Sequence, residues 1–129
     1  RSSFSLSVNH VDTYTGITDR DRARTIAALG RAAEATAAGD YGVDDFAEEF
    51  RAPGHVHLLR AAPSLAARQG HTELAVTLAA AADREPAAVV CEMLDDATGE
   101  ALTPDDARAY ADRHGLPYVE GAAVIEAFG

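Results

Sequence analysis

Serine and apolar residues alternate through the first part of the chain. In Ser3-Phe4-Ser5-Leu6-Ser7-Val8 every second side chain is apolar, and this period of two predicts a half-buried β-strand. The first residue is Arg1, and no basic and apolar leader precedes the strand, so this start is not typical of a secretory signal. Because the first residues already belong to a strand, we expect the chain to be the C-terminal part of a longer protein.

Helical periodicity and apolar runs alternate through the rest of the chain. The pattern predicts helices at residues 19–38, 44–50, 72–82, 104–114 and 122–128, and strands at 56–60, 87–94 and 116–119. Thr18 and Thr103 stand where a side-chain oxygen caps a helix, and Gly39 and Gly115 follow two of the expected helix ends. Since strands and helices interleave, we expect the α/β class, a layered fold with a mixed β-sheet flanked by helices and with its N-terminal part missing.

The composition is that of one acidic domain. The chain has 129 residues, and its 21 Asp and Glu residues against 11 Arg and no Lys give a net charge of −10. An acidic surface repels phosphate backbones and anionic lipids, so neither nucleic acid nor a membrane is an expected partner. This charge predicts a halophilic protein, and a GC-rich genome is an alternative reason for the excess of Arg and Ala. Cys91 is the single cysteine, which excludes an internal disulfide and predicts a cytoplasmic location.

The stretch Arg68-Gln69-Gly70-His71-Thr72-Glu73 runs from a predicted loop into a predicted helix. A helix N-terminus exposes backbone N–H groups and a partial positive charge. Arg68 offers a fork for a phosphate, His71 offers a nitrogen for a metal, and Gly70 allows the backbone to come close to a ligand. These residues suit an anionic substrate beside a divalent cation. The alternative is a helix capped by Thr72, with a surface arginine and an incidental histidine.

A carboxylate and two other groups complete the candidate chemistry. Glu92 lies in the apolar run at 87–94, where burial would raise its pKa and make it a general base. The alternative places Glu92 on the solvent face of a half-exposed strand. Cys91, which faces the other way along a strand, is expected to be an inert core thiol. His55 follows the turn Ala52-Pro53-Gly54 and is a candidate proton donor, or else an exposed histidine after a turn.

Four blocks of sequence carry a resemblance to a known family. They occur in the order Thr15-Gly16-Ile17-Thr18 with Asp21-Arg22 and Thr25-Ile26, then Arg51 to Val56, then Arg68 to Glu73, then Pro86-Ala87 with Cys91-Glu92-Met93. Together they resemble 3,4-dihydroxy-2-butanone 4-phosphate synthase of riboflavin biosynthesis, across essentially the whole chain. The most specific parts are the Gly-His-Thr-Glu block and the Cys-Glu pair.

The resemblance implies a lyase that converts D-ribulose 5-phosphate to 3,4-dihydroxy-2-butanone 4-phosphate and formate, with Mg²⁺ or Mn²⁺ as cofactor. Carried over by motif, His55 and Glu92 are the catalytic residues and His71 is a metal ligand. The implied substrate-binding residues are Arg68, Gln69, Gly70, His71, Thr72 and Glu92. The Thr15 to Thr25 block is expected to shape the pocket or a dimer contact. A homodimer is expected, because members of this family form their active sites between subunits.

One part of the family pattern has no counterpart in this sequence. Family members carry an acidic, glycine-containing loop near the N-terminus that supplies a carboxylate to the metal. We therefore expect residues 1–129 to be the C-terminal portion of a single synthase domain, inactive as a fragment. The alternative is a non-catalytic binding or assembly module of the same fold. The enzyme is favoured by the presence of His55, Arg68, His71, Thr72 and Glu92.

Overall fold

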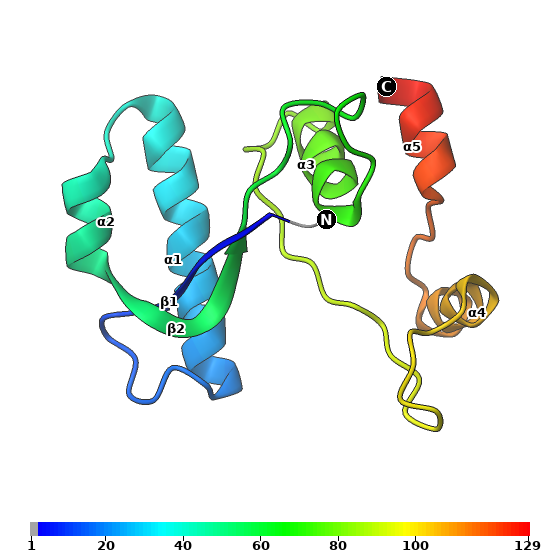
Figure 1. Cartoon of the computed structure of the whole chain (residues 1–129), viewed down its shortest axis with the longest axis horizontal. Coiled ribbons are helices and arrows are strands. Elements are labelled where there is room, and N and C mark those ends of the chain that lie inside the picture. The colour runs from blue at the N-terminus through cyan, green and yellow to red at the C-terminus, as the bar shows by residue number, and fades with distance from the viewer. Residues whose placement is uncertain (1–2) are drawn as a thin grey trace.

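The computed structural model of the protein describes residues 3–129, in which β1 (Phe4–His10) and β2 (Phe50–Leu59) form an antiparallel sheet. The helices are α1 (Asp19–Ala38), α2 (Val43–Glu49), α3 (His71–Ala81), α4 (Pro104–His114) and α5 (Gly121–Phe128). Figure 1 shows the sheet lying across α1, with α2 on its outer side and with α3 between the sheet and α5. Within residues 3–129, none of the helices combines the length and the apolar character needed to span a membrane.

The two best-marked helices begin and end where the sequence predicts. Thr18 caps α1 by accepting a hydrogen bond from the N–H of Asp21 at 3.1 Å, and Thr103 caps α4 in the same way from Asp106 at 3.2 Å. Gly39 ends α1 with a φ of 84°, a left-handed conformation that glycine adopts without strain. These ends are confirmed because each signal acts within a few residues of the boundary.

The pairing of β1 with β2 contains a bulge. Val8 lies opposite Val56 and Asn9 lies opposite Arg51, so residues 52–55 of β2 project between two neighbouring pairs. Gly54 makes this possible, since its Cα lies so close to the backbone of Val8 that a side chain would clash. The predicted strand at 56–60 is therefore longer than expected. It begins at Phe50, and the expected turn is a bulge within it.

A small apolar core joins α1 to the sheet. Its buried members are Val8, Ala28, Ala32 and Phe50, with Leu29, Tyr41, Phe46 and Leu58 packed against them. Alanines on α1 let the helix lie close to the strands, and the stacked rings of Phe46 and Phe50, with centroids 4.7 Å apart, fasten α2 to β2. At the other side of the molecule, Leu74 of α3 packs against Gly121 at the start of α5.

The α/β class is confirmed, but two predicted strands are not formed. The sheet within residues 3–129 has two strands, in the order β1–β2, so the expected mixed sheet is not observed in this part of the chain. Residues 87–94 and 116–119 are irregular apart from one isolated bridge between Leu94 and Ala101. An apolar run forms a strand only where a neighbouring strand accepts its hydrogen bonds, and the described sheet offers these runs no such neighbour.

Gly30 within α1 and Gly39 directly after its end give a matched test of where the helix ends. A Cβ at Gly30 or at Gly39 would meet no atom within 4 Å, but only Gly39 has a positive φ. Gly30→Ala should therefore raise the free energy of unfolding by about 0.8–1.0 kcal/mol, the difference in helix propensity. Gly39→Ala should lower it by about 1–2 kcal/mol, the cost of the left-handed conformation. Urea unfolding measures both, and equal effects from the two variants would contradict the assigned end of α1.

Candidate functional site

The first turn of α3 is organised by a buried carboxylate. Glu73 is 3% exposed, and its carboxylate accepts hydrogen bonds from the N–H of Gly70 at 3.2 Å and from the N–H of Ala62 at 2.9 Å. It also forms an ion pair with Arg68. Glu73 thus caps the helix and fastens the preceding loop to it. The hydrogen bond from Ala62, together with the charge of Arg68, holds the pKa of Glu73 below its ordinary value.

The arginine of this motif has a fixed place. The guanidinium of Arg68 lies against the Cα of Gly70, where an added side chain would clash with it. In this structure the absence of a side chain at position 70 makes room for Arg68, whereas the sequence predicts that Gly70 allows the close approach of a ligand. Since a buried carboxylate holds the guanidinium, Arg68 has a defined orientation at the start of α3.

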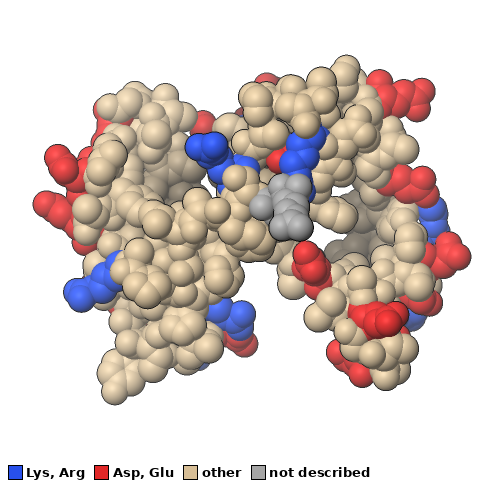
Figure 2. Space-filling view, in the orientation of Figure 1, with Lys and Arg blue, Asp and Glu red and all other residues tan. Residues whose placement is uncertain are grey.

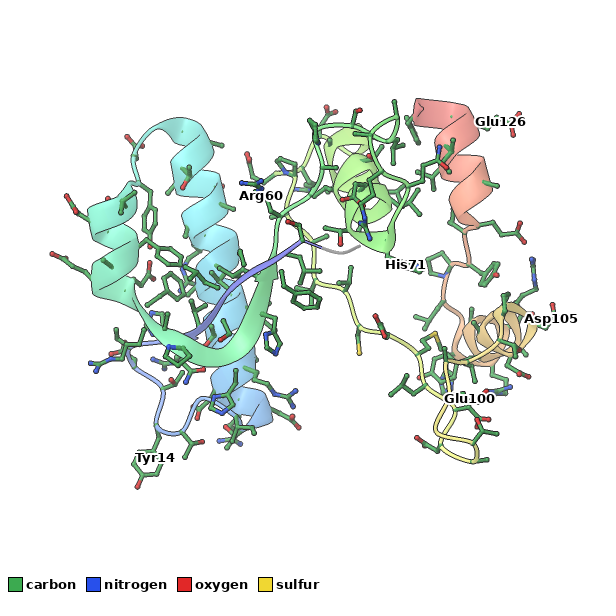
Figure 3. All side chains as sticks on the ribbon, in the orientation of Figure 1. Tyr14, Arg60, His71, Glu100, Asp105 and Glu126 are labelled. Atoms are coloured by element: carbon green, nitrogen blue, oxygen red, sulfur yellow. The ribbon has the colours of Figure 1, made fainter. Side chains whose placement is uncertain are left out.

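The remaining residues of the motif are displayed at the start of α3. His71 is the first residue of the helix and is exposed, and Figure 3 shows it at the N-terminal end of α3. Gln69 is exposed and Thr72 is half-buried. Thr72 lies inside the helix, so the expectation that it caps α3 is wrong; the capping position belongs to Gly70. In Figure 2, acidic side chains gather over α2 and over the α4–α5 side, whereas basic ones reach the surface beside α3.

His55 belongs to a second cluster, on the bulge of β2. Its backbone N–H donates to Oδ1 of Asn9 at 2.8 Å, and its ring Nδ1 lies 3.2 Å from the same oxygen. The side chain of Asn9 in turn lies against Gly16, where any Cβ would clash with the amide. His55 itself is exposed. The side chain of Asn9 on β1 therefore contacts both the backbone and the ring of His55.

The Thr15 to Thr25 block surrounds that asparagine. One carboxylate oxygen of Asp21 accepts hydrogen bonds from the N–H groups of Gly16 at 2.9 Å and Thr15 at 3.2 Å. The first of these is the main reason that the pKa of Asp21 lies below its ordinary value. Thr25 is buried and accepts a hydrogen bond from the N–H of His10 at 3.0 Å. Asp21 therefore holds in place the loop in which Gly16 contacts the side chain of Asn9.

Two expectations about the segment after α3 are wrong. Glu92 and Cys91 are both exposed and lie in the irregular connection to α4, which Figure 1 draws in yellow-green to yellow. Glu92 is therefore not a carboxylate of a buried strand, and Cys91 is not a core thiol. Both expectations depended on a strand at 87–94, and without a paired strand the run has no buried face in the described structure.

The structure thus brings together Arg68, Gly70, His71 and Thr72, but it presents His55 and Glu92 on other segments. It also shows two residues, Glu73 and Asn9, for which the sequence pattern predicts no role. Glu73 stands three residues after the capping position, and this spacing is a known signal of a capping interaction. Asn9 lies 46 residues from His55, and no local pattern indicates a contact of that range.

The comparisons with known proteins agree over nearly the whole chain. Residues 1–127 match the family described as 3,4-dihydroxy-2-butanone 4-phosphate synthase. Enzymes of that name from Archaeoglobus fulgidus and Methanosarcina mazei are each 52% identical to this chain, over 127 and 128 residues. In both cases the alignment covers 98% of this chain and 52% or 51% of the relative. The chain therefore spans about half the length of the curated relatives it matches.

Solved structures give the same result. The crystal structure of 3,4-dihydroxy-2-butanone 4-phosphate synthase from Candida albicans superposes with a TM-score of 0.80 at 31% identity, covering 97% of this chain and 59% of that one. A two-domain synthase from A. baumannii superposes with a TM-score of 0.74 at 30% identity, covering 90% of this chain and 31% of that one.

The carboxylate of Glu73 generates a pH-dependent prediction. Because its pKa is lowered from 4.5 in the folded protein, its ionised form stabilises the fold above that value, and this contribution is lost as the pH falls through the folded pKa. Glu73→Gln should therefore lower the free energy of unfolding at pH 7, with a difference from the parent that shrinks below pH 4.5. Urea unfolding across a pH series measures this.

The exposed Glu126, which points away from α5 in Figure 3, provides the matched control. Glu126→Gln should change stability little at any of these pH values. If Glu73→Gln costs the same stability at every pH, the charge of Glu73 contributes nothing to the start of α3.

Proposed function

The chain belongs to the 3,4-dihydroxy-2-butanone 4-phosphate synthase family, and we propose that it forms part of an enzyme converting D-ribulose 5-phosphate to 3,4-dihydroxy-2-butanone 4-phosphate and formate. The observation that carries this proposal is the start of α3, where Arg68 is held in place by Glu73 beside a helix N-terminus. A guanidinium and a helix N-terminus together suit a sugar phosphate, which is an anion.

Arg68 binds the phosphate of the substrate, and Gln69, Gly70 and Thr72 line the same end of α3. A guanidinium that is already fixed by a carboxylate loses little side-chain freedom when the phosphate binds. The N–H groups at the helix start point toward the anion and add the partial positive charge of the helix. These residues therefore position the sugar phosphate, whereas other residues react with its carbon chain.

The reaction requires repeated proton transfers. It needs enolisation, loss of a hydroxyl, a shift of the carbon skeleton and release of one carbon, and each step forms or consumes an enediolate beside a carbonyl. His55 exchanges protons with the sugar, because a neutral imidazole has one nitrogen that donates a proton and one that accepts it. Glu92 contacts the sugar and carries protons as well. Its exposed position in residues 82–103 means that this role requires it to be covered in the working enzyme.

Mg²⁺ or Mn²⁺ is the proposed cofactor, with His71 as one ligand. Residues 3–129 contain no group of three or more His, Cys, Asp or Glu side chains placed to hold a metal ion, so the donor set found here does not form a metal site by itself. His71 is exposed at the start of α3 and offers one imidazole. We therefore propose that residues 1–129 alone turn over no substrate.

Formate release tests the function. The full-length protein that contains these residues is incubated with D-ribulose 5-phosphate, and formate is followed by proton NMR with and without EDTA. We expect release that requires Mg²⁺ or Mn²⁺ and that falls at least about 100-fold in His55→Ala, His71→Ala and Glu92→Gln.

His57→Ala is the matched control. His57 lies on the same strand as His55, where its ring packs edge-on against Phe4, and the variant should retain the parent rate. An unaltered rate in His71→Ala would remove His71 from the metal site. Absence of formate from the parent protein would instead favour the alternative, a non-catalytic binding or assembly module of the same fold.

We also propose a homodimer, as the family resemblance implies. Leu6 of β1 and Val89 of the connection after α3 are exposed, as surfaces covered by a second subunit would be in a single chain. Sedimentation equilibrium of the full-length protein, at low and high salt, should give twice the chain mass. A monomer at micromolar concentration under both conditions would contradict the proposal.

A further inference from the structure

The contact between Asn9 and His55 determines which atom of the asparagine faces the histidine. The backbone N–H of His55 can only donate a hydrogen bond, and the asparagine atom 2.8 Å from it must therefore be the acceptor, Oδ1. The identity of an asparagine oxygen is often ambiguous, but a backbone donor removes the ambiguity. The side-chain oxygen Oδ1 of Asn9 thus faces the bulge of β2.

The same oxygen also determines where the imidazole carries its proton. Nδ1 of His55 lies 3.2 Å from Oδ1 of Asn9. Since Oδ1 has no hydrogen to donate, a hydrogen bond between these atoms requires the proton to be on Nδ1. In a neutral imidazole the other nitrogen, Nε2, then has a lone pair and is the proton acceptor.

The amide of Asn9 is held from its other side. Gly16 has a φ of 81° and lies so close to Asn9 that a Cβ would clash with the amide. The N–H of Gly16 donates to Asp21 at 2.9 Å, and the same carboxylate accepts from the N–H of Thr15 at 3.2 Å. The loop is thereby fixed to the start of α1, and it leaves the side chain of Asn9 little room to turn away from His55.

We propose that Asn9 is a positioning residue that keeps the neutral side chain of His55 protonated on Nδ1 and leaves Nε2 as the atom that exchanges protons with the substrate. This inference rests on the proposed role of His55. When Nε2 takes a proton from the sugar, the ring becomes an imidazolium whose Nδ1–H still donates to Oδ1 of Asn9. When Nε2 returns that proton, the neutral form with its proton on Nδ1 is restored. The Thr15 to Thr25 block thus acts on the reaction through Asn9.

A purely structural role for Asn9 has a different signature. Closing the bulge of β2 needs only the backbone hydrogen bond from His55, and the ring contact is then incidental. In that case the position of the ring proton would not depend on the side chain at residue 9. The two roles are therefore separated by a measurement on the imidazole itself.

Nitrogen NMR of the full-length protein, with ¹⁵N-labelled histidine, reads this directly. Protonated and unprotonated ring nitrogens have well-separated shifts, and His57 on the same strand is an internal reference. We expect the neutral form of His55 to carry its proton on Nδ1 in the parent and in Asn9→Asp, whose carboxylate accepts but cannot donate. In Asn9→Ala the proton should shift substantially to Nε2, while the His57 signals stay unchanged.

The parent spectrum is decisive even if Asn9→Ala does not fold, because a neutral His55 with its proton on Nε2 would overturn the proposal. An unchanged tautomer in a folded Asn9→Ala variant would overturn it as well. In the formate assay, Asn9→Ala should lose about tenfold in kcat with little change in KM, and Asn9→Asp should recover most of that loss.

The kinetics separate this proposal from the function on which it rests. If His55→Ala abolishes formate release while Asn9→Ala retains the parent kcat, the role of Asn9 is overturned and that of His55 stands. If His55→Ala remains fully active, the proposed role of His55 fails, and the positioning role of Asn9 in catalysis fails with it. The NMR result then still decides whether Asn9 sets the ring proton.

Discussion

The antiparallel pairing of β1 with β2 is the constraint on which this half of the molecule depends. It brings Val8 and Phe50 into one core with Ala28 of α1. The same pairing produces the bulge of β2, where Gly54 lies against the backbone of β1 and His55 forms a hydrogen bond with Asn9. Because the same strand pairing organises the core and places His55 beside Asn9, loss of the pairing would disturb the core packing and the position of His55 together.

At the start of α3 a different interaction dominates: the buried carboxylate of Glu73 orients the guanidinium of Arg68. Burial removes water from the carboxylate of Glu73. Hydrogen bonds from the N–H groups of Ala62 and Gly70 and the ion pair with Arg68 replace the lost hydrogen bonds to water. The result is a loop that is joined to the first turn of α3 by hydrogen bonds and an ion pair. An arginine held in this way keeps a fixed position relative to the N-terminus of α3, and that geometry is what the proposed binding of a sugar phosphate would use.

His55 and Glu92 differ in how well the surrounding residues hold them in place. The His55 cluster has its supporting residues within the described chain, since Asn9, Gly16 and Asp21 form a continuous series of contacts. The segment that carries Glu92 has no comparable support, and apolar residues beside it, such as Val89 and Leu94, are exposed. An exposed apolar run of this kind is typical of a surface that takes part in an interaction.

The sequence by itself determined the helices, whose caps and ends at Thr18, Gly39 and Thr103 act within a few residues. It also determined the family, because the four motif blocks are short and occur in a specific order. Only the tertiary structure decided which apolar runs became strands, which carboxylate pairs with Arg68, and which side chain contacts His55. Those outcomes depend on partners many residues away, as in the contact between Asn9 and His55 across 46 positions. A strand or a buried polar group is stabilised by those distant partners, and a local pattern does not reveal whether they are present.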